Sequence, residues 1–371
     1  MKINCEKYLL EEAIRTVSKA ASPKSPLTAL RGILLKADMT SLRLTAYDLR
    51  RGIYTDIEAD VEDAGSAVID ARLFENIVRH LPDGMVRIVV DASLNVLIKC
   101  GQSEFNIKAS SADDYPELPE PDRVREIEIS QELLKEMIVR TSFSISKNES
   151  RPVYTGALFE IEDSHLALVA VDGYRLSMRS ADINLEHSDL LRFIIPAYSL
   201  SDIEKICQSG EDKFCQFKLG SKHISVHFSG TVLITRRLEG EFLDYKTAVP
   251  RDFRYKIKLN RRELLDGLDR VSLMTDESSK APVKLFFADG KLDLSCDTIQ
   301  GRSFDSIISE GNGEGLTIGF NDVFLKEALR AIDEEEILFC LNTDSSPAVI
   351  KGLNQDNRYL YMVLPVRLIA R

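Results

Sequence analysis

Two histidines, His223 and His227, are spaced four residues apart, which on a helix would let both imidazoles bind one metal ion. The surrounding segment, KHISVHF, alternates polar and apolar residues and is therefore predicted to be a strand. On a strand the two side chains lie roughly 13 Å apart, at about 3.3 Å per residue, too far apart to share an ion. We therefore expect no metal site here, and nothing else in the sequence indicates a cofactor.

Other local patterns offer little more support for catalysis. The glycine-rich stretch 311–315 could cradle a phosphate, but no Lys-Ser/Thr pair follows it and no helix is predicted at its end, which favours a flexible loop. The three glutamates 334–336 are interpreted as a solvated acidic turn after a helix. No histidine has an obvious serine or cysteine nucleophile as a partner. The enzymatic alternative is a hydrolase or transferase that uses clustered acids, namely Asp113, Asp114 and Asp172.

The composition is that of an acidic globular protein. The chain has 371 residues, with 48 Lys and Arg against 59 Asp and Glu, and a formal net charge of −11. Taken alone, this charge argues against nucleic-acid binding, because basic side chains on phosphates supply most of that affinity. No apolar run approaches the ~18 residues of a membrane span, and acids interrupt the first residues where a signal peptide needs an apolar stretch. We therefore expect a cytoplasmic protein.

Cysteine usage agrees with a reducing compartment. The cysteines are scattered and form no Cys-x-x-Cys pair, so they are interpreted as reduced, mostly buried thiols. They are Cys5, Cys100, Cys207, Cys215, Cys296 and Cys340.

An internal repeat sets the elements that must position any site. Three segments pair a short strand with an amphipathic helix: MKINCEKYLLEEAIRTVSKAA, EIEISQELLKEMIVRTSFSI and RYKIKLNRRELLDGLDRVSLM. A second set of strand–helix segments and a set of strand pairs recur at nearly the same interval. The matching positions are Leu9, Leu133 and Leu264; Ile69, Ile195 and Ile318; and Leu44, Leu168 and Leu294. Three features with one period indicate three copies of a domain of about 125 residues.

The predicted fold class is α+β, with strands outnumbering helices and two helices in each repeat. The predicted domains are 1–122, 123–252 and 253–371. The predicted helices are 6–20, 71–80, 131–142, 198–208, 261–274 and 322–332. Polar residues mark several helix starts, namely Ser130, Ser201, Asn260 and Asn321.

Five short motifs carry a resemblance to a known family. They are SADDYP at 111–116, GALFE at 156–160, VDGYRL at 171–176, LEGEF at 238–242 followed by Asp244-Tyr245, and LPVRL at 364–368. Each motif is weak alone, but their order across three repeats is specific. Over essentially its whole length the chain resembles the bacterial sliding clamps, the beta subunits of DNA polymerase III.

The resemblance implies a head-to-tail homodimer of three-domain subunits. In that family six similar domains form a ring, with the sheets outside and twelve helices lining a hole that holds duplex DNA. Such a ring holds DNA by topology and needs neither base readout nor a catalytic group. The resemblance therefore implies a non-catalytic processivity factor that tethers the alpha subunit of the replicative polymerase, the clamp loader and repair proteins. A three-repeat adaptor that binds proteins without encircling DNA is the second alternative.

The family's partner-peptide groove lies between the second and third domains, and the resemblance implies the positions of its two walls here. One wall is formed by Arg151, Tyr154, Val171, Gly173, Tyr174, Arg175 and Leu176; the other by Leu243, Thr247, Ala248, Met362, Val363, Leu364, Pro365, Val366 and Arg367. Core packing is the simpler interpretation of Leu176 and Met362. The family usually has proline at 243 and a basic residue at 247, and this chain continues past the usual terminal leucine through Ile369-Ala370-Arg371.

The resemblance also implies a dimer contact between a first-domain strand and a third-domain edge. Phe105 and Ile107 would meet Leu273 and Met274. Because the family often places basic residues on the first side and acids on the second, Glu104 and Arg302 predict a charge-swapped pair.

For DNA, the matching positions are Lys24, Arg72, Arg79, Lys147 and Asn148, for which solvated surface charge is the simpler interpretation. One usual contact is expected to be missing, because the segment 196–198 reads Pro-Ala-Tyr where the family has basic residues. By domain the net charges are −5, −3 and −3, whereas the six predicted helices carry 13 basic and 13 acidic residues. A neutral helical wall is compatible with a ring that slides on DNA without gripping it.

Overall fold

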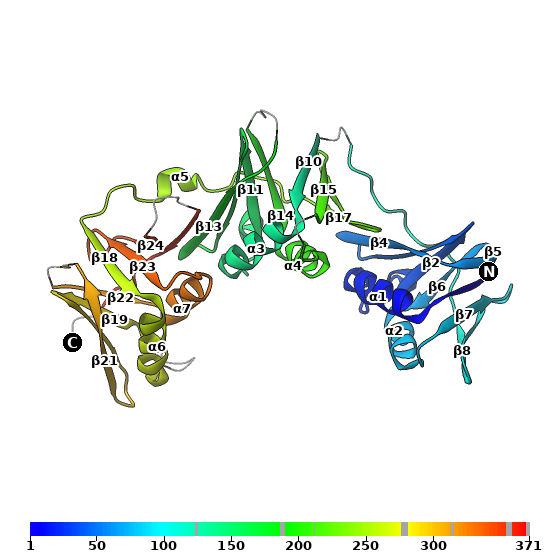
Figure 1. Cartoon of the computed structure of the whole chain (residues 1–371), viewed down its shortest axis with the longest axis horizontal. Coiled ribbons are helices and arrows are strands. Elements are labelled where there is room, and N and C mark those ends of the chain that lie inside the picture. The colour runs from blue at the N-terminus through cyan, green and yellow to red at the C-terminus, as the bar shows by residue number, and fades with distance from the viewer. Residues whose placement is uncertain are drawn as a thin grey trace. The chain divides into compact units, whose positions relative to one another are not determined.

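The computed structural model describes residues 1–122, 125–185, 190–210, 212–275, 281–311, 313, 315–353 and 358–368. These residues form two compact units. Figure 1 labels their helices and strands. The first unit comprises Met1–Leu134 and Ser201–Arg237, and the second comprises Lys135–Leu200 and Leu238–Arg371.

The helices agree closely with the sequence prediction. They are α1 (Lys7–Val17), α2 (Ala71–His80), α3 (Gln131–Thr141), α4 (Ala197–Ile206), α6 (Arg261–Val271) and α7 (Asp322–Arg330). The ends of the predicted helices 6–20 and 261–274 are 3-10 turns, at Ser18–Ala20 and Ser272–Met274. A four-residue helix, α5 (Tyr245–Ala248), was not predicted.

The helix caps explain most of these boundaries. The side chain of Asn260 accepts a hydrogen bond from the Glu263 amide at 3.0 Å, and Asn321 caps α7 in the same way. Ser201 is not a cap, and that expectation was wrong. It lies inside α4, where its hydroxyl accepts a hydrogen bond from Lys205 Nζ at 3.1 Å.

The first unit contains two antiparallel sheets. The five-stranded sheet has the order β5-β1-β7-β8-β9, and the eight-stranded sheet has the order β10-β15-β16-β17-β4-β3-β2-β6. Their strands are β1 (Lys2–Glu6), β2 (Gly32–Asp38), β3 (Ser41–Tyr47), β4 (Arg51–Glu58), β5 (Asp60–Asp63), β6 (Gly65–Asp70), β7 (Met85–Val90), β8 (Asn95–Cys100), β9 (Ser103–Lys108), β10 (Arg125–Ser130), β15 (Phe214–Leu219), β16 (His223–His227) and β17 (Thr231–Arg236). The two histidines lie on β16, which confirms the strand prediction.

The second unit contains one twelve-stranded sheet with the order β14-β11-β12-β13-β25-β24-β23-β18-β21-β20-β19-β22. Its strands are β11 (Gly156–Glu162), β12 (His165–Val171), β13 (Arg175–Asp182), β14 (Leu191–Pro196), β18 (Tyr255–Asn260), β19 (Val283–Ala288), β20 (Lys291–Asp297), β21 (Arg302–Glu310), β22 (Leu316–Phe320), β23 (Glu336–Leu341), β24 (Ala348–Gly352) and β25 (Tyr359–Val363).

Sheets continue across the junctions between repeats in both units. In the first unit β17 pairs with β4, and Ile234 lies opposite Gly52. In the second unit β25 pairs with β13, and Met362 lies opposite Leu176. The same antiparallel addition of a strand therefore joins the first repeat to the second and the second to the third.

The helices pack their apolar stripes against the sheets. In the last repeat Leu264 and Leu268 of α6 and Leu325 and Leu329 of α7 are fully buried in one core cluster. These residues recur four positions apart, so they lie on one side of each helix. The six cysteines are free and buried, as expected. Among the residues described, no helix combines the length and apolar character needed to cross a membrane.

Candidate functional site

The pairing of β13 with β25 brings together two motifs that lie far apart in the sequence. Leu176 is opposite Met362, and Arg175 is opposite Val363. Beyond the strand ends, the Leu364 amide donates a hydrogen bond to the Tyr174 carbonyl oxygen at 2.8 Å. The segments 171–176 and 362–364, predicted to form opposite walls of one groove, are therefore neighbours in the fold.

An apolar cluster lies at this junction. Its buried members include Leu176 and Met362, which are 1% and 7% exposed, together with Tyr245 of α5. Half-buried apolar side chains pack against the cluster, among them Phe242 and Leu243. Leu176 and Met362 can therefore be part of the core and also of a partner surface. They are buried themselves, but they support the half-buried Phe242 and Leu243 at the surface.

Part of the second wall of the candidate groove lies in the segment 242–248, which contains α5. The rings of Phe242 and Tyr154 meet edge to face, with centroids 5.5 Å apart. At the start of α5 the Thr247 hydroxyl donates a hydrogen bond to Asp244 Oδ2 at 2.7 Å. Thr247 is exposed and Ala248 half-buried, as accessible wall residues would be.

Glu160 of β11 anchors α5 to the sheet. This carboxylate is 3% exposed and accepts hydrogen bonds from Tyr245 Oη at 2.7 Å and Arg192 Nε at 2.6 Å. Lys246 Nζ lies 2.8 Å from Oε1, the oxygen to which Tyr245 also donates. Burial by itself would raise the pKa of Glu160, but the hydrogen bonds from Lys246, Tyr245 and Arg192 outweigh burial and hold the pKa below its ordinary value. The sequence analysis missed Glu160 as a site residue, because its partners come from distant segments.

Two predicted groove residues have side chains inside the fold. Arg175 is 9% exposed; its guanidinium donates to Asp172 Oδ2 at 2.9 Å and also to Glu327, and it stacks over the Phe324 ring at 4.4 Å. Val363 is 1% exposed and belongs to the core cluster of the last repeat. A role for Arg175 or Val363 in the groove stays a prediction, and any such role would act through neighbouring residues.

The remaining groove candidates are accessible to different degrees. Gly173, in the left-handed region at φ +94°, and Tyr174, 65% exposed, form the turn between β12 and β13. Val171 is buried at the end of β12. The exposed candidates are Arg151, Val366 and Arg367, and the half-buried ones are Leu364 and Pro365. Residues 369–371, the extension past the usual terminus, lie outside the described residues, as do Asn312 and Glu314 of the glycine-rich stretch.

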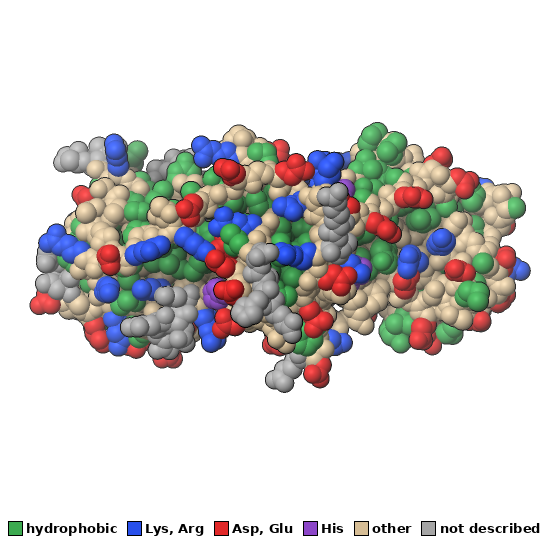
Figure 2. Space-filling model, turned by 90° about the horizontal axis from the view of Figure 1, so that it is seen from above, with side chains coloured by type: hydrophobic (Ala, Val, Ile, Leu, Met, Phe, Trp, Pro, Cys, Tyr) green, Lys and Arg blue, Asp and Glu red, His purple; other side chains and the backbone are tan. Residues whose placement is uncertain are grey.

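The candidate DNA-facing residues are all exposed. Arg72 and Arg79 lie seven residues apart on α2, on one exposed face, and Arg79 donates a hydrogen bond to Asn76 Oδ1 at 2.9 Å. Lys24 lies in a turn of the first unit, and Lys147 and Asn148 follow the 3-10 turn after α3 in the second. On the face shown in Figure 2, basic and acidic side chains are interspersed and neither sign covers it continuously.

The candidate dimer strands differ in position: β9 is the edge strand of its sheet, and β21 lies inside its sheet but leaves part of one side unpaired among the described residues. Within the described chain β9 pairs with β8 alone, and it exposes Glu104 and Phe105. Among the described residues, β21 pairs with β20 from Arg302 to Ile308 and with β18 only at Ser309 and Glu310, so its second edge from 302 to 308 has no strand partner there. Leu273, in the 3-10 turn after α6, is 84% exposed.

Two exposed apolar residues on β21 were missed by the sequence analysis. Phe304 and Ile308 are 60% and 75% exposed on the strand that carries Arg302. Their spacing of four places them on one face of the strand, and this period could have identified them. Within the chain, Arg302 lies 3.4 Å from Asp297, and Glu104 lies 3.9 Å from Lys99.

Two acids of the enzymatic alternative, Asp113 and Asp172, have structural partners. Asp113 accepts a hydrogen bond from the Ser111 hydroxyl at 2.9 Å. Asp172 accepts hydrogen bonds from the amides of Tyr174 and Arg175 as well as from the Arg175 side chain. Both arrangements are those of turn-stabilising aspartates. Across the described ranges, no group of His, Cys, Asp and Glu is placed to hold a metal ion.

Three repeats of sheet and paired helices, joined by strand addition at their junctions, define a three-domain clamp. Family models of the DNA polymerase III beta subunit match the whole succession: the N-terminal domain over residues 1–119, the central domain over 128–244 and the C-terminal domain over 246–367. The chain belongs to this family, the bacterial beta sliding clamps.

Relatives and solved structures agree along the full length. The chain is 29% identical to the beta sliding clamp of Bacillus subtilis over 378 residues, covering 99% of this chain and 100% of that one, and 30% identical to that of Chlamydia muridarum over 369 residues, covering 99% of each. The crystal structure of a putative DNA polymerase III beta subunit from Eubacterium rectale matches with a TM-score of 0.94 and 35% identity, covering 99% of each chain. The Bacillus subtilis sliding clamp structure matches with a TM-score of 0.95 and 29% identity, covering 100% of each.

Proposed function

We infer that this chain is a DNA polymerase processivity factor, a sliding clamp with no catalytic site of its own. The observation that carries this conclusion is the match of all three domain models, in order, along one chain. The hydrolase, transferase and adaptor alternatives gain no support from the family. The matched ranges support three functional domains, for which we propose the limits 1–122, 123–252 and 253–371, and we expect the clamp to act in the cytoplasm.

We propose that two chains close into a head-to-tail ring around duplex DNA. The open edges of β9 and β21 support this, because unpaired strand edges with exposed apolar side chains pair readily with another chain. Phe105 and Ile107 would face Leu273 and Met274, with Phe304 and Ile308 adding apolar area. Glu104 and Arg302 would exchange their present partners for each other at the rim.

DNA would be held by enclosure and not by specific contacts. Lys24, Arg72, Arg79, Lys147 and Asn148 are proposed to make weak, exchangeable phosphate contacts, which position a protein on DNA without reading sequence. An overall net charge of −11 supports sliding over gripping, since strong binding would require many basic contacts.

We propose that the surface around Leu176, Met362 and the segment 242–248 binds short peptides of the replicative polymerase alpha subunit, the clamp loader and other partners. Apolar anchors in such a site supply most of the energy of a small interface. Leu243 and Thr247 replace the family's usual proline and basic residue, so we expect this surface to prefer less acidic peptides than those of its relatives.

One experiment tests enclosure. The protein is loaded by its clamp loader onto nicked circular DNA, and the circle is then cut once with a restriction enzyme. We expect retention for minutes on the circle and rapid loss after linearisation. Equal retention on both forms would contradict a ring and favour direct binding. A circle without the restriction site, treated with the same enzyme, is the control.

A further inference from the structure

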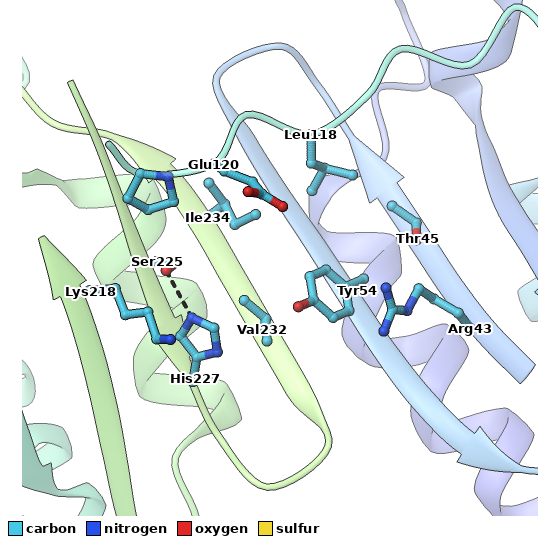
Figure 3. A pocket seen from close by; sticks show the side chains of 11 residues that line it. Arg43, Thr45, Tyr54, Leu118, Glu120, Lys218, Ser225, His227, Val232 and Ile234 are labelled. Atoms are coloured by element: carbon cyan, nitrogen blue, oxygen red, sulfur yellow. Dashed lines mark hydrogen bonds between the residues drawn. The ribbon is translucent and has the colours of Figure 1, made fainter. Parts of the chain in front are cut away.

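A cavity of about 410 Å³ lies in the first unit, where β17 of the second repeat joins β4 of the first. Figure 3 shows Val232 and Ile234 between Arg43 and Tyr54 on one side and Lys218 on the other. Leu118 lies above them; it belongs to the segment 109–122 that follows β9, which we call the linker. All the lining residues belong to the first unit.

The cavity lies at the repeat equivalent of the candidate peptide groove. The strand pairs of the repeat are offset by 124 residues between the first two copies, from Leu44 to Leu168, which relates Gly52 to Leu176. Ile234 pairs with Gly52 as Met362 pairs with Leu176. The same backbone arrangement is therefore built twice, once at each junction.

The junction between the first and second repeats differs from the one between the second and third in the residue that fills its apolar floor. A Cβ atom on Gly52 would lie 2.2 Å from Leu118 Cδ2, so the absence of a side chain there admits Leu118. Leu118 thus lies over Gly52, and the position equivalent to Gly52 at the later junction is Leu176. Beside it, the space bounded by Tyr54, Val232 and Ile234 stays open.

Two basic side chains lie on the rim of the cavity, each beside a carboxylate that lies outside the lining. Arg43 stacks over the Tyr54 ring at 4.4 Å and bonds Asp56 at 2.7 and 2.8 Å, while Lys218 Nζ lies 3.3 Å from Glu126. Neither of these two carboxylates lines the cavity. The charged residues of the lining are therefore two basic side chains, Arg43 and Lys218, and one acid, Glu120. This local excess of basic residues contrasts with the net charge of −11 for the whole chain.

A neutral polar wall completes the cavity. His227 Nε2 lies 2.9 Å from the Ser225 hydroxyl, and both residues line the space. Burial and, next, the neighbouring Lys218 lower the pKa of His227, so its imidazole is neutral at pH 7 and can exchange hydrogen bonds. An apolar floor with a few convergent polar groups has the chemistry of a binding site.

We propose that this cavity is a second peptide-binding site, which takes an apolar side chain of a partner beside an acidic residue. The comparison with a peptide groove rests on the proposed function. The residues that line the cavity and their charges do not depend on that function. Its preference for acidic peptides would set it apart from the groove at the second junction.

Methyl NMR on the full-length protein tests both sites at once. The probe is the peptide acetyl-Asp-Leu-Asp-Leu-Phe-amide, and its counterpart has Lys in place of Asp. The Ile234 methyl reports the cavity and the Met362 methyl reports the groove. We expect the Ile234 signal to shift in a saturable manner with the acidic peptide, and to respond at least tenfold more weakly to the Lys peptide.

Variants define the charge dependence. Lys218→Gln should weaken binding at the Ile234 signal about threefold to fivefold, whereas Lys222→Gln, an exposed lysine outside the lining, should change it less than twofold. A shift at Met362 alone would overturn the second site and leave the groove intact. A shift at Ile234 with the acidic peptide, and none at Met362 with either peptide, would support the second site and contradict the groove. No shift at either residue, or equal binding of both peptides at Ile234, would overturn the proposal.

Discussion

Glu160 is a buried charge whose three donors come from two distant segments, β14 and α5. A buried carboxylate is tolerated only when hydrogen bonds replace its lost hydration. Arg192 and Lys246 are each about half exposed, so water solvates the cations while the carboxylate stays dry. The arrangement therefore fixes α5 to β11 and, with it, one wall of the candidate peptide surface.

Replacement of Glu160 should loosen α5 without unfolding the domain. In Glu160→Gln we expect amide exchange at Ala248 and Val249, whose amides bond within α5, to quicken roughly thirtyfold, since hydrogen bonds to a charged group contribute about 2 kcal/mol. Hydrogen-exchange mass spectrometry measures this. Glu162→Gln, at an exposed acid that also contacts Lys246, is the matched control and should show little change. Equal exchange in both variants would contradict the anchoring role.

Asp202 of α4 forms a second buried pair inside the first unit. It is 5% exposed, and its carboxylate lies 2.7 Å from Arg51 of β4. Burial raises the pKa of Asp202 to about 6 despite the nearby Arg51. The folded state thus binds this proton more tightly than the unfolded chain, and the associated stability is present below about pH 4 and lost as the pH rises through 6.

Comparison with Asp202→Asn should reveal this pH dependence. We expect the unfolding free energy of the wild type, relative to the variant, to fall by about 2–3 kcal/mol between pH 4 and pH 7. Urea unfolding at several pH values measures it. The variant Asp289→Asn, at an exposed turn, should run parallel to the wild type. A constant difference between wild type and Asp202→Asn would show that the carboxyl has an ordinary pKa.

At the scale of elements, helices were predictable and strand edges were not. Leucine spacing and the caps Asn260 and Asn321 are local signals, so the helix limits agree within a few residues. The open edge of β21 depends on where β18 stops pairing, which no local pattern encodes. Likewise the contact between the segments 171–176 and 362–364 came from the family resemblance, because strand order between distant segments is set by tertiary packing.

The open edges of β9 and β21 allow a test of the dimer. Arg302→Glu should weaken dimerisation about twofold to fivefold, because an exposed ion pair contributes up to about 1 kcal/mol. Phe304→Asp, which removes a 60% exposed aromatic from the same strand, should weaken it at least tenfold. Analytical ultracentrifugation at several concentrations gives the dimer constants. Leu190→Asp, at another exposed apolar residue, is the control. An unchanged constant for Arg302→Glu would contradict the charge-swapped pair.

At the scale of the whole molecule, enclosure and phosphate contact make separable contributions. In the double variant Arg72→Ala, Arg79→Ala, we expect the half-life on closed circular DNA to change less than twofold. For binding to a short linear duplex, the slope of the logarithm of the binding constant against the logarithm of salt concentration should be smaller in magnitude by about 2. Each lost phosphate contact reduces the magnitude of this slope by about 0.9. Lys36→Ala, at an exposed residue of β2, should alter neither measurement. A much shorter half-life on the circle would mean that these contacts, and not the ring, retain DNA.

The fit of Leu118 over Gly52 makes the first linker a ligand of its own domain. Because Leu118 is tethered, it competes with a free ligand for the space over Gly52 at an effective concentration of the order of millimolar. Its binding does not carry the entropy cost of bringing two molecules together. A free peptide with micromolar affinity would gain little by displacing it and would instead use the space alongside. At one junction the chain's own leucine therefore fills part of the apolar floor, and at the other the equivalent position carries Leu176.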